Sequence, residues 1–385
     1  MRTPRFRTAR FTTVACLLSV SAAIGAGDGR RGTDDTSPPG STESADLLFY
    51  SALAGANAGD VALPEGILAS EDVIMVYQHQ FGIYPSVTME GEVTNGGVPQ
   101  NVNIQEHLRE LERDINIQIP ADYSGYVIID YEEWHPFWED TATRYRNFCV
   151  AQVRAQKPTW DDARVERKAR KDFEKAAKKF IMRTLDKCRQ LRPDAKWGIW
   201  AYPKARFRDN NARWLWKRHD AFFPTIYMLN QLVPDGVEPG LGQASESAFI
   251  EDLLVGRVAF ASEIAGDRQV MTVMWPKYSG NNENQALRYQ PLSPENLTLA
   301  LELPFAYGAD GMVIWDNIPQ PGIAVAFQEL LDYRIAPEIR RILTDMGLPT
   351  DGLENEVDPG DSEEPIEGLD DGPVVDGGGA VRPGG

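Results

Sequence analysis

Residues 126–134 read YVIIDYEEW, an apolar run that passes directly into acidic residues and a tryptophan. A short run that is apolar throughout, rather than alternating with polar residues, is typical of a strand buried on both faces of a parallel sheet. We therefore predict a strand over 126–132. Similar runs predict further strands at 72–78, 197–203, 222–228, 269–276 and 311–316, with a short additional strand at 85–90.

Amphipathic segments separate these predicted strands, with apolar residues at helical spacing. We predict helices over 104–115, 160–191, 245–263, 294–303 and 324–343. Six or seven strand–helix units in about 300 residues favour a closed barrel over an open sheet. No glycine-rich phosphate-binding pattern follows the first strands, which argues against a nucleotide-binding fold. The expected fold is α/β, a distorted TIM-like (β/α) barrel, with a single catalytic domain over 47–348.

The two ends of the chain differ in composition from this central block. Residues 1–26 combine four arginines, an apolar run and small residues, the order found in a secretory signal peptide. We expect a polar linker over 27–46 and a disordered acidic tail over 349–385. The tail segment 351–385 holds eleven acids and one base, so −10 of the net charge of −18 lies there. The protein is expected to be secreted, periplasmic or at the cell surface; an N-terminal anchor is the alternative.

After the predicted signal peptide only two cysteines remain, Cys149 and Cys188. Export would permit a disulfide between them, but sequence alone does not establish that they are close. Cys188 also continues an apolar helical spacing, which suits a small buried residue. A disulfide and two free thiols are equally open.

Asp130 and Glu132 stand two residues apart at the end of the predicted strand, so their side chains should project from the same face. An ionised Asp130 should raise the pKa of Glu132 and keep a proton on it near neutral pH. A proton donor of this kind is what cleavage of a glycosidic bond needs. A solvated loop start or a metal site is the alternative interpretation. Only His135 lies nearby as a further ligand, so we expect no metal and no organic cofactor.

Other predicted strands also end in aromatic residues, which suit stacking on the apolar faces of sugar rings or simply a packed core. These residues are Trp200, Tyr202, Tyr227 and Trp315. A basic stretch, 204–218, follows one strand end and has a local net charge of +5. It is interpreted either as a surface for a polyanion or as a solvated loop.

The segment 81–138 resembles the hyaluronidases of glycoside hydrolase family 56. It carries G-x-Y-P at 82–85, N-G-G-x-P-Q at 95–100 and D-x-E-x-W-x-P at 130–136, and the likeness extends over 72–345. The resemblance implies endo-hydrolysis of a β-linked N-acetylhexosamine polymer with retained configuration, the substrate's acetamido oxygen acting as nucleophile. It also implies Glu132 as proton donor, Asp130 and Tyr227 as supports of the acetamido group, and Trp315 as a wall of the sugar site.

Several positions depart from the family pattern. Trp200 stands where a tyrosine is usual, which would either remove a hydroxyl from the acetamido pocket or shift its role to Tyr202. His135 stands where an arginine is customary, and Tyr131 stands where other aromatic residues occur. The family's opening strand is not recognisable before Asp72, and its usual cysteines are absent. With Tyr84 and Arg206, these residues complete the substrate-binding set that we expect.

The expected partner is a polysaccharide, either hyaluronan, chondroitin or a related acidic glycan. We expect no nucleic acid partner and no membrane contact beyond the signal peptide. Two other functions remain open on the sequence. A barrel without catalysis could bind acidic glycans through residues 204–218, and a polysaccharide lyase would need a Tyr/His/Asn base arrangement that we do not identify.

Overall fold

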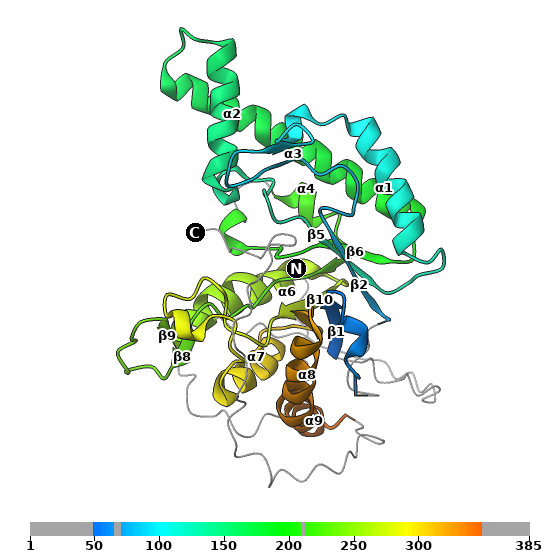
Figure 1. The fold of residues 1–385 in the computed structure, drawn as a ribbon, viewed down its shortest axis with the longest axis vertical. Coiled ribbons are helices and arrows are strands. Elements are labelled where there is room, and N and C mark those ends of the chain that lie inside the picture. Colours follow the sequence, from blue (N-terminus) through cyan, green and yellow to red (C-terminus); the bar gives the residue numbers. More distant parts are fainter. Residues whose placement is uncertain (1–48, 65–70, 209–211, 349–385) are drawn as a thin grey trace, which may run out of the picture.

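The computed structural model describes residues 49–64, 71–208 and 212–348. The signal peptide predicted at 1–26, the linker at 27–46 and the tail at 349–385 lie outside these residues. Within them, seven parallel strands form the wall of a barrel (Figure 1). The strands are β1 (Phe49–Ala54), β2 (Val73–Tyr77), β5 (Tyr126–Asp130), β6 (Lys196–Ile199), β7 (Ala221–Phe222), β10 (Gln269–Met274) and β11 (Gly311–Asn317).

The wall consists of two hydrogen-bonded groups of strands. One has the order β1-β11-β10-β7 and the other β2-β5-β6. A bridge between Trp200 and Phe223 joins β6 to β7, and β1 lies beside β2. The wall is therefore continuous in order but irregular in hydrogen bonding. This is the distorted (β/α) barrel that the sequence predicts.

Helices cover the outside of this wall. They are α1 (Ile104–Gln118), α2 (Thr143–Gln156), α3 (Asp162–Leu191), α4 (Arg213–Trp216), α5 (Glu246–Phe249), α6 (Phe260–Ala265), α7 (Pro294–Ala306), α8 (Pro321–Leu330) and α9 (Ala336–Asp345). Figure 1 shows α1 to α3 on the side of β2, β5 and β6, and α7 to α9 on the side of β1 and β10. Two π-helical segments, Ile250–Ala259 and Leu331–Ile335, continue α5 into α6 and α8 into α9.

The strands separate two apolar layers. Residues such as Val127 and Ile129 of β5 belong to the large core under the helices. Tyr126 and Ile128 belong to a smaller cluster, which residues from β1, β2, β10 and β11 share, inside the barrel. Because side chains alternate along a strand, Asp130 falls on the same side as Tyr126 and Ile128. The sequence of β5 thus directs this carboxyl group into the barrel.

Some predicted elements differ from those observed. β5 ends at Asp130 rather than at residue 132, and β6 ends at Ile199 rather than at 203, since the chain leaves the sheet to form the mouth of the barrel. The elements that were not predicted include β1 and α2. β1 has the sequence FYSALA, whose small residues lack the β-branched pattern of a strand. It supplies the opening strand that we do not recognise from the sequence before Asp72.

Candidate active site

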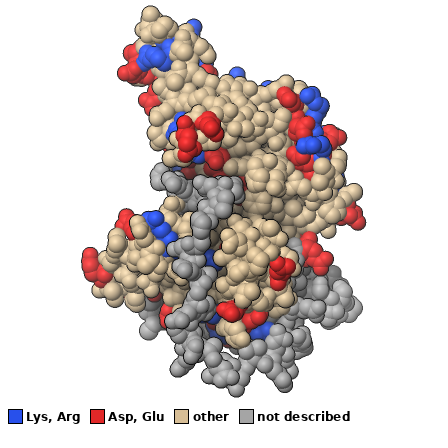
Figure 2. Space-filling view, viewed as in Figure 1, with Lys and Arg blue, Asp and Glu red and all other residues tan. Residues whose placement is uncertain are grey.

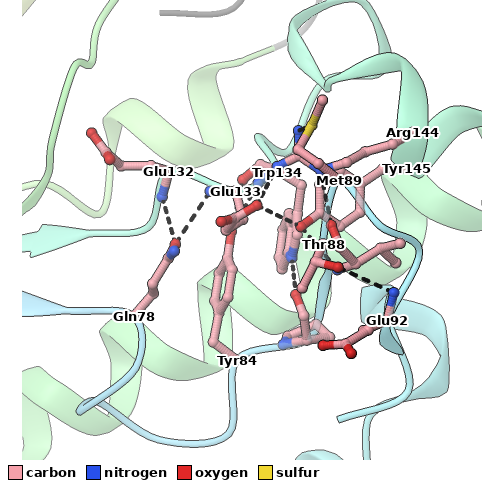
Figure 3. A network of polar contacts seen from close by, with 12 residues as sticks. Gln78, Tyr84, Thr88, Met89, Glu92, Glu132, Glu133, Trp134, Arg144 and Tyr145 are labelled. Carbon is pink, nitrogen blue, oxygen red and sulfur yellow. Dashed lines mark hydrogen bonds and ion pairs between the residues drawn. The ribbon is translucent and has the colours of Figure 1, made fainter. Parts of the chain in front are cut away.

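The turn that follows β5 is held by one side chain from the neighbouring strand end. Gln78, just after β2, accepts hydrogen bonds through Oε1 from the backbone N–H groups of Glu132 (3.0 Å) and Glu133 (3.2 Å). The Gln78 N–H in turn donates to the carbonyl of Asp130 at 3.1 Å. Figure 3 shows the Glu132 side chain pointing away from Gln78 and from Glu133. The clamp therefore orients Glu132 beyond the end of the strand.

Glu133 serves a different purpose from its neighbour. Its Oε2 forms an ion pair with Arg144 and accepts a hydrogen bond from the hydroxyl of Tyr145 at 2.8 Å. The same network appears on the right of Figure 3. With its carboxylate occupied in this way, Glu133 anchors the turn to α2 and leaves Glu132 as the acid available at the barrel mouth.

The surroundings of Asp130 and Glu132 are too dry for both carboxyls to ionise, so the pair retains at least one proton. Asp130 is only 7% exposed, and this burial raises the pKa of its carboxyl group to about 7. Burial also raises the pKa of Glu132 well above its usual range, and the charge of Asp130 adds to this rise. A hydrogen bond between the two carboxyls lowers the pKa of Asp130 and raises that of Glu132. The proton therefore resides on Glu132. Burial raises the pKa of Glu132 more than the charge of Asp130 does, whereas the sequence had suggested only the charge.

Two tyrosine hydroxyls face this pair. Tyr77, at the end of β2, accepts a hydrogen bond from the indole N–H of Trp315 at 3.0 Å. Burial raises the pKa of Tyr77 to about 12, and the nearby charges of Asp130 and Glu132 contribute. The pKa of Tyr227 is raised well above its usual range by burial and by the same two carboxyls. Both hydroxyls stay protonated and can donate hydrogen bonds beside the acids.

Three indole rings surround Tyr227. Its ring stacks on Trp315, with centroids 6.1 Å apart and planes at 20°, and lies 5.8 Å from Trp200 and 6.0 Å from Trp275. A hydrogen bond from Trp200 lowers the pKa of Tyr227, opposing the effect of burial. The arrangement is an aromatic wall beside an acid pair of which Asp130 is buried and Glu132 partly buried, suited to holding a sugar ring.

The comparisons with known proteins agree with this geometry. The family described as hyaluronidase, glycoside hydrolase family 56, matches residues 60–334. The chain belongs to this family. It is 31% identical to human hyaluronidase-1, over 73% of this chain and 67% of that protein, and 29% identical to a chondroitin hydrolase of Caenorhabditis elegans, over 74% and 66%. The chain thus spans about two thirds of the length of these relatives.

A solved structure shows the same fold. Bee venom hyaluronidase superposes with a TM-score of 0.60 at 25% identity, covering 77% of this chain and all of that one. The barrel prediction and the resemblance to hyaluronidases are both confirmed. The barrel mouth of this family member therefore holds Asp130, Glu132, Tyr227, Trp200 and Trp315 together, as the motifs suggest.

Other residues that we expected in the site lie elsewhere. The Tyr84 ring stacks on Trp134 at 4.9 Å, and its hydroxyl donates to the Trp134 carbonyl. Tyr131 donates its hydroxyl to the carbonyl of Phe81 at 2.7 Å. Both tyrosines belong to the core under the helices, because residue 131 follows Asp130 with its side chain on the opposite side and Tyr84 packs against it.

Tyr202 and Arg206 bind a different carboxylate, Asp140, and the His135 ring lies edge to face on Tyr202 with centroids 5.6 Å apart. The Tyr202 hydroxyl donates to Asp140 Oδ2 at 3.0 Å, Lys204 pairs with the same oxygen at 2.9 Å, and Arg206 pairs with Oδ1. Burial and the charges of Lys204 and Arg206 hold the pKa of His135 well below its usual range, so its ring is neutral. The Tyr202 hydroxyl is thus engaged by Asp140 rather than by Asp130 or Glu132.

The basic stretch 204–218 is largely neutralised. Besides the pairs with Asp140, Arg208 pairs with Glu263 at 2.6 Å and Arg218 with Asp186 at 3.2 Å. On the face that Figure 2 shows, the basic residues lie mostly beside acidic ones and form no large basic patch. A barrel that merely binds acidic glycans through this stretch is therefore less well supported than the sequence suggests.

Tyr77, Gln78, Trp275 and Lys277 were not predicted from the sequence as residues of the site. Each follows or ends a predicted strand, so the rule that barrel function collects at strand ends could have found them. Lys277 forms an ion pair with Asp316 at 2.7 Å, and Asp316 accepts from the indole N–H of Trp275 at 2.8 Å.

Cys149 and Cys188 are both buried and free, so the alternative of two thiols holds. Within the described ranges no three His, Cys, Asp or Glu side chains meet as metal ligands, and no helix there is long and apolar enough to span a bilayer.

Replacing Asp130 should change how stability depends on pH. Because the folded state disfavours ionised Asp130, the wild type should lose stability as pH rises from about 4 to about 7, by up to roughly 4 kcal/mol. Asp130→Asn removes this loss, so its melting temperature relative to wild type should be higher at pH 8 than at pH 5. Thermal unfolding at both pH values measures this. The same difference at pH 5 and pH 8 would contradict a raised pKa.

Tyr202→Phe should be structural in effect. Loss of the hydrogen bond to Asp140 should lower the free energy of unfolding by about 1 kcal/mol. The rate of glycan cleavage should change less than about threefold, since the lost hydroxyl does not face the acids. Denaturant unfolding and steady-state kinetics separate the two effects. A large fall in kcat at unchanged stability would return Tyr202 to the active site.

Proposed function

We propose that this chain is an exported endo-β-N-acetylhexosaminidase of hyaluronidase type that hydrolyses a glycosaminoglycan-like polymer. The observation that carries the proposal is the pair of a buried Asp130 and a partly buried Glu132, with the proton on Glu132, beside an aromatic wall. Membership of the hyaluronidase family supports it. Export rests on the signal peptide expected at 1–26.

The proposed reaction uses Glu132 first as an acid and then as a base. Glu132 donates its proton to the glycosidic oxygen while that bond breaks, and the acetamido oxygen of the substrate attaches to the anomeric carbon. A water molecule then attacks this carbon, the bond from the carbon to the acetamido oxygen breaks, and the water gives one proton to the Glu132 carboxylate. Two inversions at one carbon retain its configuration, and no second enzyme nucleophile is needed.

The remaining groups prepare the substrate for this attack. Asp130 accepts a hydrogen bond from the acetamido N–H and so makes its oxygen more nucleophilic, while Tyr227 donates its hydroxyl to position the group. Trp315 and Trp200 shape the space for the ring. Preorganised groups of this kind need little rearrangement as charge develops at the anomeric carbon.

The substrate class follows from the mechanism and from the relatives. Acetamido participation requires an N-acetylhexosamine at the cleaved bond, and both hyaluronan and chondroitin contain one. The relatives carry the names of a hyaluronidase and of a chondroitin hydrolase. His135, neutral and beside Lys204, differs from the arginine usual in the family, so we propose that preference between these polymers differs from the hyaluronidases.

Glu132→Gln should abolish cleavage. The amide cannot donate and recover a proton, so kcat should fall by roughly 10²–10⁴-fold, while the fold is retained. Release of reducing ends from hyaluronan and chondroitin measures the rate. The control is Glu139→Gln, which changes an exposed acid on the neighbouring turn and should leave activity intact. Equal cleavage by Glu132→Gln and wild type would remove Glu132 from the mechanism.

Trp200→Phe tests the support of Tyr227. The variant keeps an aromatic ring but loses the indole N–H that bonds Tyr227, so the hydroxyl should be less well oriented. We expect kcat to fall about 5- to 50-fold with little change in KM, because the loss is felt mainly in the transition state. A rise in KM alone would instead assign Trp200 to ground-state sugar binding.

A further inference from the structure

An exposed aromatic side chain continues the wall of the active site outward. Tyr289 is 44% exposed, and its ring meets that of Trp275 edge to face, with centroids 5.9 Å apart. Trp275 in turn lies 5.5 Å from Trp315 and 6.0 Å from Tyr227. The rings therefore form an unbroken row from the acid pair to the surface.

The loop that carries Tyr289 is firmly held. Its two arms pair with each other, as the Tyr278 N–H donates to the Gln290 carbonyl at 2.9 Å and the Tyr289 N–H to the Tyr278 carbonyl at 3.0 Å. The buried Tyr278 hydroxyl donates to Asn296 of α7 at 2.8 Å, and Ser279 N–H bonds the carbonyl of Met228. The exposed ring is thus presented in a fixed place, which lowers the entropy lost when a ligand binds.

The backbone at Tyr289 is in the left-handed region, with φ of 61°, which a residue with a side chain rarely adopts. Such strain persists where the surroundings impose it, and it clusters at functional sites. Gly280 makes room for this conformation, since a Cβ at that position would overlap the Tyr289 hydroxyl. The loop keeps an exposed aromatic ring at a cost in backbone energy, which points to a use for the ring.

Trp275 is held from behind by a buried ion pair. Asp316 is 1% exposed in its side chain and accepts the Trp275 indole N–H, while Lys277, at 12%, neutralises the other carboxylate oxygen. This contact fixes the tilt of the indole that joins Tyr289 to the active site. The rings of Tyr289 and Trp275 are therefore both held in fixed positions before any ligand binds.

We propose that Tyr289 and Trp275 form an outer binding site for a second sugar ring of the polymer, beyond the ring at which cleavage occurs. Pyranose rings have apolar C–H faces that stack on aromatic planes, and the row of rings leads directly from the proposed acid to this site. The inference rests on the proposed function for the identity of the ligand. It assigns to Tyr289 a binding role and no part in the chemistry.

The test compares substrate lengths. Wild type, Tyr289→Ala and Tyr333→Ala are assayed on a series of hyaluronan and chondroitin oligosaccharides; Tyr333 is a similarly exposed tyrosine on another element, at 52%. Tyr289→Ala should raise KM roughly 2- to 12-fold on long chains, with kcat unchanged and no effect on the shortest chain cleaved. Tyr333→Ala should match wild type. Equal KM for Tyr289→Ala and wild type at every length, or an equal loss of kcat at every length, overturns the proposal.

Two further variants separate stacking from folding. Tyr289→Phe keeps the ring and should retain wild-type KM, whereas Gly280→Ala displaces the ring and should reproduce part of the loss. A Tyr289→Phe variant as weak as Tyr289→Ala contradicts stacking.

A binding measurement distinguishes failure of this site from failure of the proposed function. Affinity for hyaluronan and chondroitin hexasaccharides is measured by tryptophan fluorescence in the Glu132→Gln background, with and without Tyr289→Ala. Weaker binding with Tyr289→Ala supports the outer site even where wild type cleaves nothing, an outcome that rejects the proposed function alone. Unchanged binding rejects the outer site even where wild type cleaves the polymer.

Discussion

Everything at the barrel mouth depends on two carboxyl groups placed where there is too little water for both to ionise. A buried carboxylate without a counter-ion is costly, and no cation pairs with Asp130 or Glu132 among the residues described. Above pH 7 the pair keeps one proton, and the hydrogen bond between the carboxyls favours its residence on Glu132. Placing two carboxyl groups together without a counter-ion is locally unfavourable, but it keeps a protonated acid available near neutral pH.

The rest of the site serves to maintain this state. The hydrogen bonds that Gln78 accepts hold the turn after β5 in place, and the neighbouring carboxylate of Glu133 forms an ion pair with Arg144. Tyr77 and Tyr227 contribute hydroxyl donors that remain protonated because the same burial raises their pKa values. Exclusion of water alone would keep both carboxyls protonated. Hydrogen-bond donors of fixed orientation, such as the two tyrosine hydroxyls, allow one carboxyl to carry a charge when a substrate binds.

The position of a side chain in this site could be predicted from the sequence only where the residue lay on a regular strand. Alternation along β5 placed Asp130 correctly, and the apolar runs located the strands and so the ends where Tyr227 and Trp315 stand. Past the strand ends, alternation no longer applies. Tyr202 follows Trp200 by two residues, yet its hydroxyl binds Asp140, a residue 62 positions earlier that no local pattern connects to it. Tyr84 shows the same limit, because a motif shared with a family does not say whether its tyrosine lines the cleft or the core.

The basic stretch illustrates a second limit, that charge in sequence is not charge at a surface. Lys204 and Arg206 form ion pairs with Asp140. Arg208 pairs with Glu263, and Arg218 pairs with Asp186. The net charge of +5 counted along 204–218 therefore does not measure how strongly this surface attracts a polyanion. Recognition of an acidic polymer by this barrel would then depend more on contacts to neutral ring faces than on steering by charge. The buried Lys277–Asp316 pair fits that view. A buried ion pair contributes little net stability, because both charges lose their contacts with water. The role of the Lys277–Asp316 pair is therefore to orient Trp275 in the aromatic wall, where the shape of the wall selects the ligand.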